Sequence, residues 1–225
     1  MISVIIPTLN AAPSIGATLV SLSPAIIDPI LTEVIISEGG SSDDIEDIAD
    51  ATGAMFLTGP AGRGRQLAAG AAAARGEWLL FLHADTVLSD NWVEAARRHI
   101  SEGPGKAACF DLAFDATGAA PRIVAGWANL RSRWLALPYG DQGLLIHRSL
   151  YKTVGGYPKI ALMEDVALVR KIGRRRLRPI GAVARTSADR YLRDGWLKRG
   201  SRNLMLLTQY FLGTSPDRLN NDYRR

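Results

Sequence analysis

A run of five apolar residues, Trp78-Leu79-Leu80-Phe81-Leu82, shows no polar alternation and ends on His83-Ala84-Asp85. Such a run is typical of a strand buried on both faces of a parallel sheet, although a buried helix can show the same pattern. Ligands of open α/β sheets bind outside the carboxyl ends of the strands. The segment therefore predicts a ligand-binding edge that contains Asp85.

The preceding residues alternate between strand and helix patterns. Short strands are predicted at residues 2–6, 34–37 and 54–57, with helices at 13–23, from 45 onward, and at 66–75. Alternation at this spacing indicates a doubly wound α/β half that is built from βαβ units. We expect these strands to be parallel.

The second half has a mixed pattern. Strands are predicted at residues 106–114 and 142–147, helices at 121–137 and 163–172, and a short basic strand pair at 177–185. The sequence therefore predicts one domain over residues 1–190, with halves at 1–105 and 106–190. Residues 191–225 form an amphipathic helical tail in this interpretation.

The charge is distributed unevenly along the chain. The net charge is +5, but residues 170–225 hold 15 Lys/Arg against 4 Asp/Glu, whereas residues 1–169 hold 12 against 18. The basic segment suits an anionic partner or is simply a solvated helical face. A single cysteine, Cys109, excludes an intramolecular disulfide and fits a reducing compartment such as the cytoplasm.

No membrane-spanning segment is predicted. The first 27 residues are uncharged, but no basic segment precedes the apolar stretch and Pro7, Asn10 and Pro13 interrupt it, so we expect a buried strand and a loop instead of a signal peptide. Residues 203–216 are too few and too polar to cross a bilayer.

Three polar clusters follow predicted parallel strands: Pro7-Thr8-Leu9-Asn10, Glu38-Gly39-Gly40-Ser41-Ser42-Asp43, and His83-Ala84-Asp85-Thr86. Each has a structural explanation by itself, since Asn10 suits a turn, Asp43 a helix cap and Glu38 an exposed surface. Parallel strands place all three clusters at one edge, which favours a shared ligand site.

Two further polar segments lie at helix starts. Gly62-Arg63-Gly64-Arg65 can turn amide and guanidinium groups toward an anion, although it is neither a Walker loop nor a GxGxxG motif. Glu164-Asp165 begins the predicted helix 166–172, where carboxylates either cap the helix or take part in chemistry.

The segments IIPTLN, SEGGSSDD, GRGRQLAAG, LFLHADT and GGYP followed by MEDVALVRKI come in the order found in family 2 glycosyltransferases. The chain resembles a small bacterial branch of that family with a GRxRQ turn and an HAD version of the DXD motif. The resemblance implies an α/β fold of the GT-A type, with a Rossmann-like nucleotide-binding half at 1–105 and an acceptor half at 106–190. It also implies a UDP- or GDP-sugar donor and a divalent metal, Mg²⁺ or Mn²⁺.

The same resemblance assigns the site residues. Nucleotide binding is expected at Pro7, Thr8, Asn10, Glu38, Gly40, Arg63, Arg65 and His83, metal binding at Asp85, catalysis at Asp165 and Glu164, and acceptor binding at Asp141 and Gln142. Glu38 stands where the family usually has aspartate, and His83 replaces the first aspartate of the DXD motif. Asp165 is the expected general base of an inverting transfer, and Asp141 is the alternative base.

The expected acceptor is a small molecule or a lipid-linked hydroxyl. The tail either packs on the domain or oligomerises, or it lies on an anionic membrane surface as a peripheral contact. Nucleic acid is not an expected partner, because the basic segment lacks a recognised binding signature. Two other functions stay open at this point: a nucleotidyltransferase, despite PTLN where a glycine-rich loop belongs, and a non-catalytic protein that binds anionic surfaces.

Overall fold

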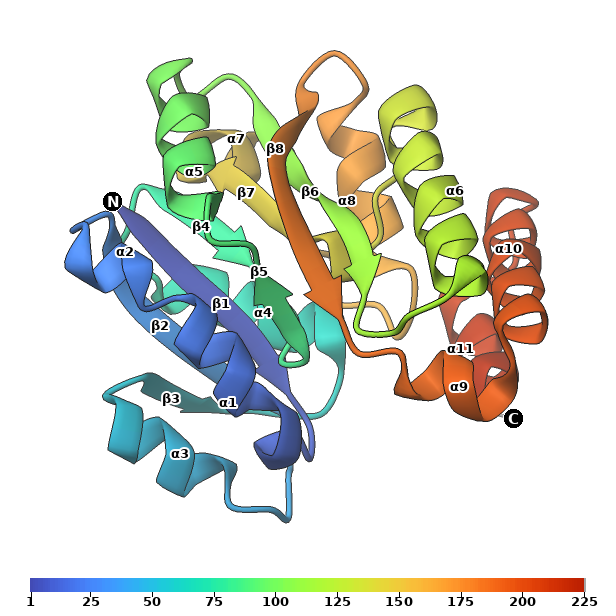
Figure 1. Cartoon of the computed structure of the whole chain (residues 1–225), viewed down its shortest axis with the longest axis horizontal. Helices are drawn as coiled ribbons and strands as arrows, with labels where there is room; N and C mark the ends of the chain where they lie inside the picture. The colour runs from blue at the N-terminus through green and yellow to red at the C-terminus, as the bar shows by residue number, and fades with distance from the viewer. Residues whose placement is uncertain (225) are drawn as a thin grey trace.

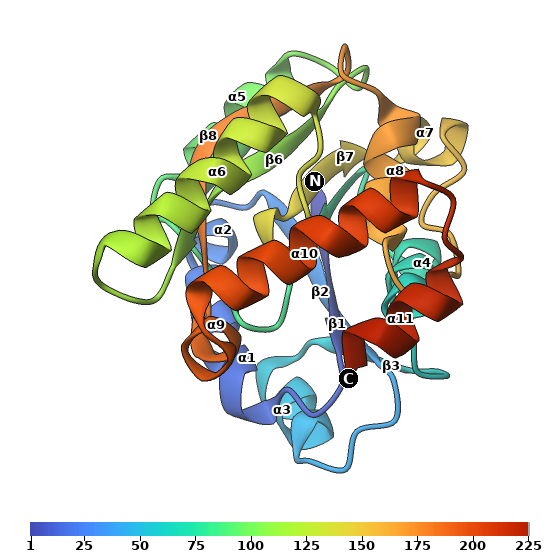
Figure 2. The ribbon, with the colours of Figure 1, turned by 90° about the vertical axis from the view of Figure 1, so that its right-hand side faces the viewer.

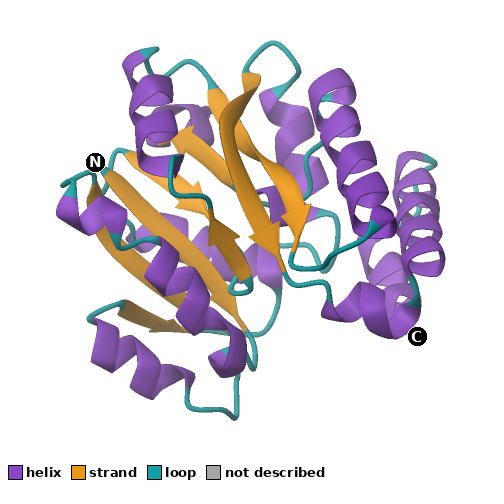
Figure 3. Cartoon of the chain, in the orientation of Figure 1, coloured by secondary structure: helices purple, strands orange, loops and turns teal. Residues whose placement is uncertain are grey.

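The computed structural model describes residues 1–224 and contains one eight-stranded sheet with the strand order β3-β2-β1-β4-β7-β6-β8-β5. Helices cover both faces of this sheet (Figures 1 and 3). The strands are β1 Ile2–Thr8, β2 Leu31–Glu38, β3 Met55–Thr58, β4 Trp78–Phe81, β5 Thr86–Leu88, β6 Ala107–Phe114, β7 Leu144–His147 and β8 Leu177–Thr186. The α-helices are α1 Ala12–Ser21, α2 Pro24–Ile27, α3 Ile45–Thr52, α4 Arg63–Ala73, α5 Trp92–Ser101, α6 Ala119–Leu135, α7 Arg148–Thr153, α8 Glu164–Ile172, α9 Asp189–Asp194, α10 Trp196–Phe211 and α11 Pro216–Arg224.

The first half is the parallel α/β unit that the sequence predicts. β1 pairs in parallel with β2 on one side and with β4 on the other, and β2 pairs in parallel with β3. All four residues of β4 are buried, as the apolar run indicates. The carboxyl ends of these strands therefore meet at one edge, where the three polar clusters follow β1, β2 and β4.

The second half continues the sheet with mixed pairing. β7 runs antiparallel to β4 and β6, β6 pairs in parallel with β8, and β5 pairs antiparallel with β8. The predicted strand pair at 177–185 is wrong, because β8 is one ten-residue strand. A register shift opposite Cys109 and Asp111 and a positive φ of 83° at Gly181 absorb the irregularity that suggested a turn.

The core lies on both faces of the sheet. One buried cluster joins α1, α3 and α5 to the sheet through residues such as Ile15, Ala49 and Trp92, and the other joins α4, α7 and α8 through residues such as Leu67 and Leu168. Cys109 is buried in β6 between β7 and β8. Burial raises the pKa of its thiol to about 12.

The tail packs against the rest of the chain, in agreement with one of the two alternatives for it. Leu206 and Leu207 of α10 and Leu219 of α11 are buried against Met163 and Val166 at the start of α8. Figure 2 shows α10 running across the molecule beside α6, with α11 below it. Within residues 1–224, no helix combines the length and the apolar character that a bilayer crossing requires.

Candidate active site

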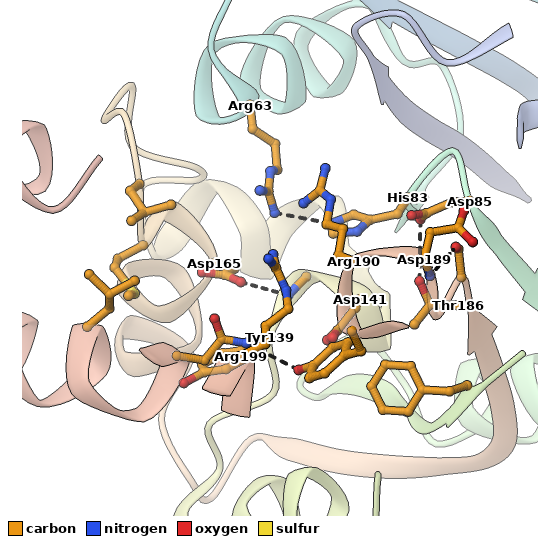
Figure 4. Close-up of a pocket in the computed structure, with 18 of the residues that line it drawn as sticks. Arg63, His83, Asp85, Tyr139, Asp141, Asp165, Thr186, Asp189, Arg190 and Arg199 are labelled. Atoms are coloured by element: carbon orange, nitrogen blue, oxygen red, sulfur yellow. Dashed lines mark hydrogen bonds between the residues drawn. The ribbon is translucent and has the colours of Figure 1, made fainter. Parts of the chain in front are cut away.

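A cavity of about 280 Å³ lies where the two halves and the tail meet. Figure 4 shows side chains converging on it from the loop after β4, the start of α4, the loop before β7, the start of α8, the end of β8 and the helices α9 and α10. Its walls include six of the predicted site residues: Arg63, His83, Asp85, Asp141, Glu164 and Asp165. Residues up to 102 positions apart in sequence thus form one polar surface, which supports the ligand-site interpretation of the edge.

Asp85 and His83 reach the cavity because β4 ends at Phe81 and the chain then turns at the edge of the sheet. The hydroxyl of Thr186, at the end of β8, lies 3.4 Å from Oδ1 of Asp85. Nε2 of His83 lies 3.4 Å from a guanidinium nitrogen of Arg63. Burial, aided by the charges of Arg63 and Arg190, lowers the pKa of His83 to about 3, so its imidazole is neutral at physiological pH.

Arg63 and Glu164 join the first half to the second. Nε of Arg63 lies 3.2 Å from Oε1 of Glu164, whose side chain is only 2% exposed. Burial raises the pKa of Glu164 to about 7, and the charge of Arg63 opposes that shift. We therefore assign Glu164 a role in holding Arg63 at the cavity wall.

Gly64 allows this approach of α4 to the loop before α8. A Cβ at position 64 would meet the carbonyl oxygen of Pro158 at 2.3 Å and Cβ of Glu164 at 3.2 Å. Any side chain would therefore push the start of α4 away from Glu164. The second glycine of the GRGR segment thus serves helix packing.

Asp165 is held rigidly at the cavity. Its Oδ2 accepts a hydrogen bond of 2.7 Å from the backbone N–H of Gly140, and its Oδ1 accepts one of 2.7 Å from the N–H of Val166. Each carboxylate oxygen has two lone pairs, so each can still accept a proton or a further hydrogen bond. The carboxylate is therefore oriented without being saturated.

Asp141 is less completely hydrogen-bonded than Asp165. Its Oδ1 is buried and has no hydrogen-bond partner. Burial raises its pKa to about 6, and the charge of Arg131 opposes the shift while those of Asp165 and Asp85 add to it. A carboxyl group that titrates near neutral pH suits proton transfer.

Five predicted nucleotide-binding residues lie together at the same edge but outside the cavity lining: Pro7, Thr8, Asn10, Glu38 and Gly40. Oδ1 of Asn10 accepts a 3.0 Å hydrogen bond from the N–H of Ser42, and Glu38 accepts one from the N–H of Ser41. The bond from Ser42 to Asn10 joins the loops after β1 and β2, and the bond from Ser41 to Glu38 lies within the turn after β2. The Thr8 hydroxyl is buried without a hydrogen-bond partner.

Gln66, in the first turns of α4, explains the glutamine of the GRxRQ segment. Its Nε2 donates to the carbonyl oxygens of Thr8 at 2.6 Å and Ser37 at 2.8 Å. The hydroxyl of Ser37 in turn donates to the carbonyl of Gln66 at 2.8 Å. The side chain thus fixes the ends of β1 and β2 relative to α4.

Two further predicted residues, Arg65 and Gln142, also lie outside the cavity lining. Arg65 is exposed on the outer side of α4. Gln142 is fully buried, where it bonds to Ser132 at 2.5 Å and to the carbonyl of Phe110 at 3.1 Å. These internal bonds use its amide, and the acceptor role expected for Gln142 stays a prediction.

The sequence interpretation missed the contribution of residues 139 and 186–206. The cavity is also lined by Ser14, Tyr139, Thr186, Asp189, Arg190, Tyr191, Arg199, Asn203 and Leu206. Most of these follow no strand-end pattern. The only signal for them was the basic character of residues 170–225, which did not distinguish a cavity wall from a solvated face.

The side chains of the cavity suit a hard cation that takes only some of its ligands from the protein. Carboxylate oxygen is the donor that Mg²⁺ and Mn²⁺ prefer, and Asp85 offers one at the cavity. Among residues 1–224, no group of three or more His, Cys, Asp or Glu side chains could hold a metal ion by itself. The site fits an ion whose other ligands come from phosphate oxygens and water.

This combination of a parallel nucleotide-type half, a mixed second half and a carboxylate-rich cavity at the strand ends is that of a GT-A glycosyltransferase. The "Glycosyl transferase family 2" profile matches residues 3–152, which is two thirds of the chain. The chain belongs to this family.

A relative of known activity agrees with this assignment. A glucosyl-3-phosphoglycerate synthase of Mycolicibacterium paratuberculosis is 33% identical over 95 residues, which cover 38% of this chain and 29% of that protein. The match therefore spans less than a third of the relative's length.

Solved structures show the same fold. Glucosyl-3-phosphoglycerate synthase from Mycobacterium tuberculosis, in complex with Mn²⁺, UDP and glucosyl-3-phosphoglycerate, has a TM-score of 0.55 and 22% identity over 83% of this chain and 70% of that one. S. aureus TarS 1-349 in complex with UDP-GlcNAc has a TM-score of 0.61 and 18% identity over 83% of this chain and 58% of that one. These similarities confirm the GT-A fold.

Proposed function

We propose that the enzyme transfers a sugar from a nucleoside-diphosphate sugar to an acceptor hydroxyl by a single inverting displacement. The observation that carries this proposal is the convergence of Arg63, Asp85, Asp141 and Asp165 on one cavity in a family 2 glycosyltransferase. UDP is the first candidate for the nucleotide, because the solved neighbours hold UDP or UDP-GlcNAc. The nucleotidyltransferase and non-catalytic alternatives are not retained, since the family is one of glycosyltransferases.

The donor occupies the sheet edge and the cavity beside it. Thr8, Asn10, Glu38, Gly40 and Pro7 surround the base and ribose in this proposal, and the buried Thr8 hydroxyl without a partner supports it. Arg63 faces the diphosphate from the start of α4, where backbone N–H groups also favour anions. Arg65 lies on the same turn, and the neutral His83 offers a polar contact without adding charge.

Asp85 is the residue that would hold the divalent ion. A bound Mg²⁺ or Mn²⁺ neutralises charge on the departing diphosphate. Arg63 stabilises the same charge from the opposite side of the cavity in this arrangement, and Glu164 holds Arg63 in place.

Asp165 acts as the general base in this proposal. It removes the proton from the acceptor hydroxyl as that oxygen attacks the anomeric carbon, whose transition state has oxocarbenium character. The acceptor, a small molecule or a lipid headgroup, enters on the side of Asp141 and Tyr191. Asp141, with its raised pKa, hydrogen-bonds the acceptor in this proposal.

A nucleotide-release assay tests the proposal. Purified enzyme is incubated with UDP- and GDP-sugars, with Mn²⁺ or with a chelator, and free nucleoside diphosphate is measured; hydrolysis into water is expected even without the natural acceptor. Release should require the metal, and UDP with Mn²⁺ should raise the melting temperature, because a ligand that binds only the folded state stabilises it.

Asp85→Ala should abolish both the release and the metal-dependent rise in melting temperature. Asp90→Ala is the matched control, because Asp90 is an exposed carboxylate on the nearby turn before α5. Release that is equally fast in the chelator would rule out the metal role of Asp85. The absence of release from every donor would count against the transferase chemistry proposed for this cavity.

A further inference from the structure

Two neighbouring helices present apolar side chains to solvent. On α6, Ile123, Trp127, Leu130 and Trp134 recur at spacings of three or four and therefore lie on one face of the helix. Trp127 is 57% exposed and Trp134 is 66% exposed. Exposed tryptophans are unusual on a soluble surface and mark contact sites when they occur together.

The exposed face of α10 adjoins this stripe. Leu197 is 88% exposed and Leu204 is 50% exposed, whereas Leu206 and Leu207 on the other side of α10 are buried. Trp127 of α6 and Leu204 of α10 line the same shallow groove between the two helices. Figure 2 shows both helices on one side of the molecule. We call the surface formed by Ile123, Trp127, Leu130, Trp134, Leu197 and Leu204 the α6–α10 face.

The two helices are also entirely without acidic residues. They contain six basic residues, three on α6 and three on α10, and no Asp or Glu. Arg133 pairs with Asp111 at 2.7 Å, and Arg199 pairs with Asp194 at 2.6 Å. The α6–α10 face therefore combines apolar side chains with an excess of positive charge, to which the exposed Arg122 and Lys198 contribute.

We propose that the α6–α10 face docks on the surface of an anionic lipid bilayer. Tryptophan and leucine side chains enter the boundary between headgroups and acyl chains, and the arginine and lysine side chains contact lipid phosphates. A second copy of the chain fits this surface less well. A two-fold contact would bring the same positive charges together, and like charges repel.

The α6–α10 face lies next to the cavity, so docking through it would orient the cavity relative to the bilayer. The groove between α6 and α10 shares Tyr139, Asp141, Tyr191 and Asn203 with the cavity. A molecule docked through this face therefore presents the Asp141 side of the cavity to the bilayer. That is the acceptor side in the proposed reaction. Only this link to the acceptor rests on the proposed function; the docking itself does not.

Vesicle flotation tests the docking without any nucleotide. The full chain is mixed with vesicles of phosphatidylcholine alone or of phosphatidylcholine with phosphatidylserine, and the floated fraction is measured at low and high salt. We expect flotation with the anionic vesicles and a decrease at high salt, because the screening of exposed charges weakens the attraction. Trp127→Ser with Trp134→Ser should reduce the affinity by at least about tenfold, because two large apolar side chains no longer enter the boundary.

The control variant is Ile26→Ser with Ile27→Ser, which removes comparably exposed apolar side chains from α2, far from α10 in Figure 1. It should float like the wild type. A second variant, Arg122→Gln with Lys198→Gln, should lose roughly fivefold in affinity per charge for anionic vesicles. All variants are compared by melting temperature, so that a folding defect is recognised.

Three results would overturn the proposal. The first is the absence of flotation with anionic vesicles. The second is equal flotation of the wild type and the tryptophan variant, which would place the contact elsewhere. The third is a wild-type dimer in light scattering that the tryptophan substitutions dissociate, which would assign the face to a second copy. Because no donor is present, none of these results bears on the proposed transfer reaction.

Discussion

At the scale of single residues, two of the carboxylates that line the cavity, Asp165 and Asp141, differ in their hydrogen bonding. Asp165 accepts two backbone hydrogen bonds, whereas Asp141 has a buried oxygen without a partner and a pKa raised to about 6. The sequence predicted both residues as candidates for the base. The family resemblance ranked Asp165 first, but no local pattern shows how its carboxylate is bonded, because the hydrogen bond from Gly140 to Asp165 joins residues 25 positions apart.

Asp165→Asn should lower kcat by about 10²–10⁴, the usual contribution of a general base. The affinity for the donor should change little, because asparagine retains the size of the side chain and can still accept a backbone hydrogen bond. Steady-state kinetics together with nucleotide titration separate the two quantities. An unchanged kcat, with Asp141→Asn inactive instead, would transfer the role to Asp141.

Asp141→Asn should stabilise the protein in a pH-dependent manner. The folded-state pKa of about 6 lies above the ordinary value of 3.8 for aspartate, so folding favours the protonated form, and wild-type stability falls as the pH rises through this interval. Asparagine cannot ionise and escapes this loss. In a chelator, the variant should therefore melt above the wild type at about pH 8 and close to it at about pH 3, below both pKa values. The same difference at both pH values would mean that Asp141 titrates normally.

At the scale of elements, the local pattern predicted the first half well because β1 and β4 are largely apolar and almost completely buried. The order β3-β2-β1-β4 depends on nearby βαβ connections, which a sequence pattern can indicate. β8 was divided wrongly, because Pro179 and Gly181 look like turn residues but lie in a bulged strand held by its neighbour β6. Pairing with β6 keeps residues 177–186 in a single strand, and the local sequence gives no sign of this pairing.

Gly64→Ala tests the contact between α4 and the loop before α8. The added Cβ would meet a backbone oxygen at 2.3 Å, so we expect the free energy of unfolding to fall by about 1–3 kcal/mol. Gly16→Ala in α1 is the control, because nothing lies within 4 Å of its Cβ position, and it should raise the free energy by up to about 1 kcal/mol. Chemical denaturation measures both changes. A Gly64→Ala variant as stable as the wild type would mean that the loop before α8 moves aside at little cost in free energy.

At the scale of the whole molecule, the cavity is made by segments from Ser14 to Leu206. The sequence placed the strand-end residues of the first half at the site, because topology alone brings them to one edge. It treated residues 191–225 as a separate tail, yet α10 supplies Arg199, Asn203 and Leu206 to the wall. This contribution depends on the packing of Leu206 and Leu207 against Val166, a long-range contact without a local signal.

The single thiol, Cys109, lies in the middle of the sheet, so its rate of alkylation measures how often the sheet opens around it. Only the thiolate reacts with alkylating reagents, and Cys109 is both enclosed and held in its protonated form at neutral pH. Labelling by iodoacetamide followed by mass spectrometry should therefore proceed at the rate at which β6 separates from β7 and β8, and a donor nucleotide should slow it. Rapid alkylation of the untreated protein would show that this part of the sheet opens without global unfolding.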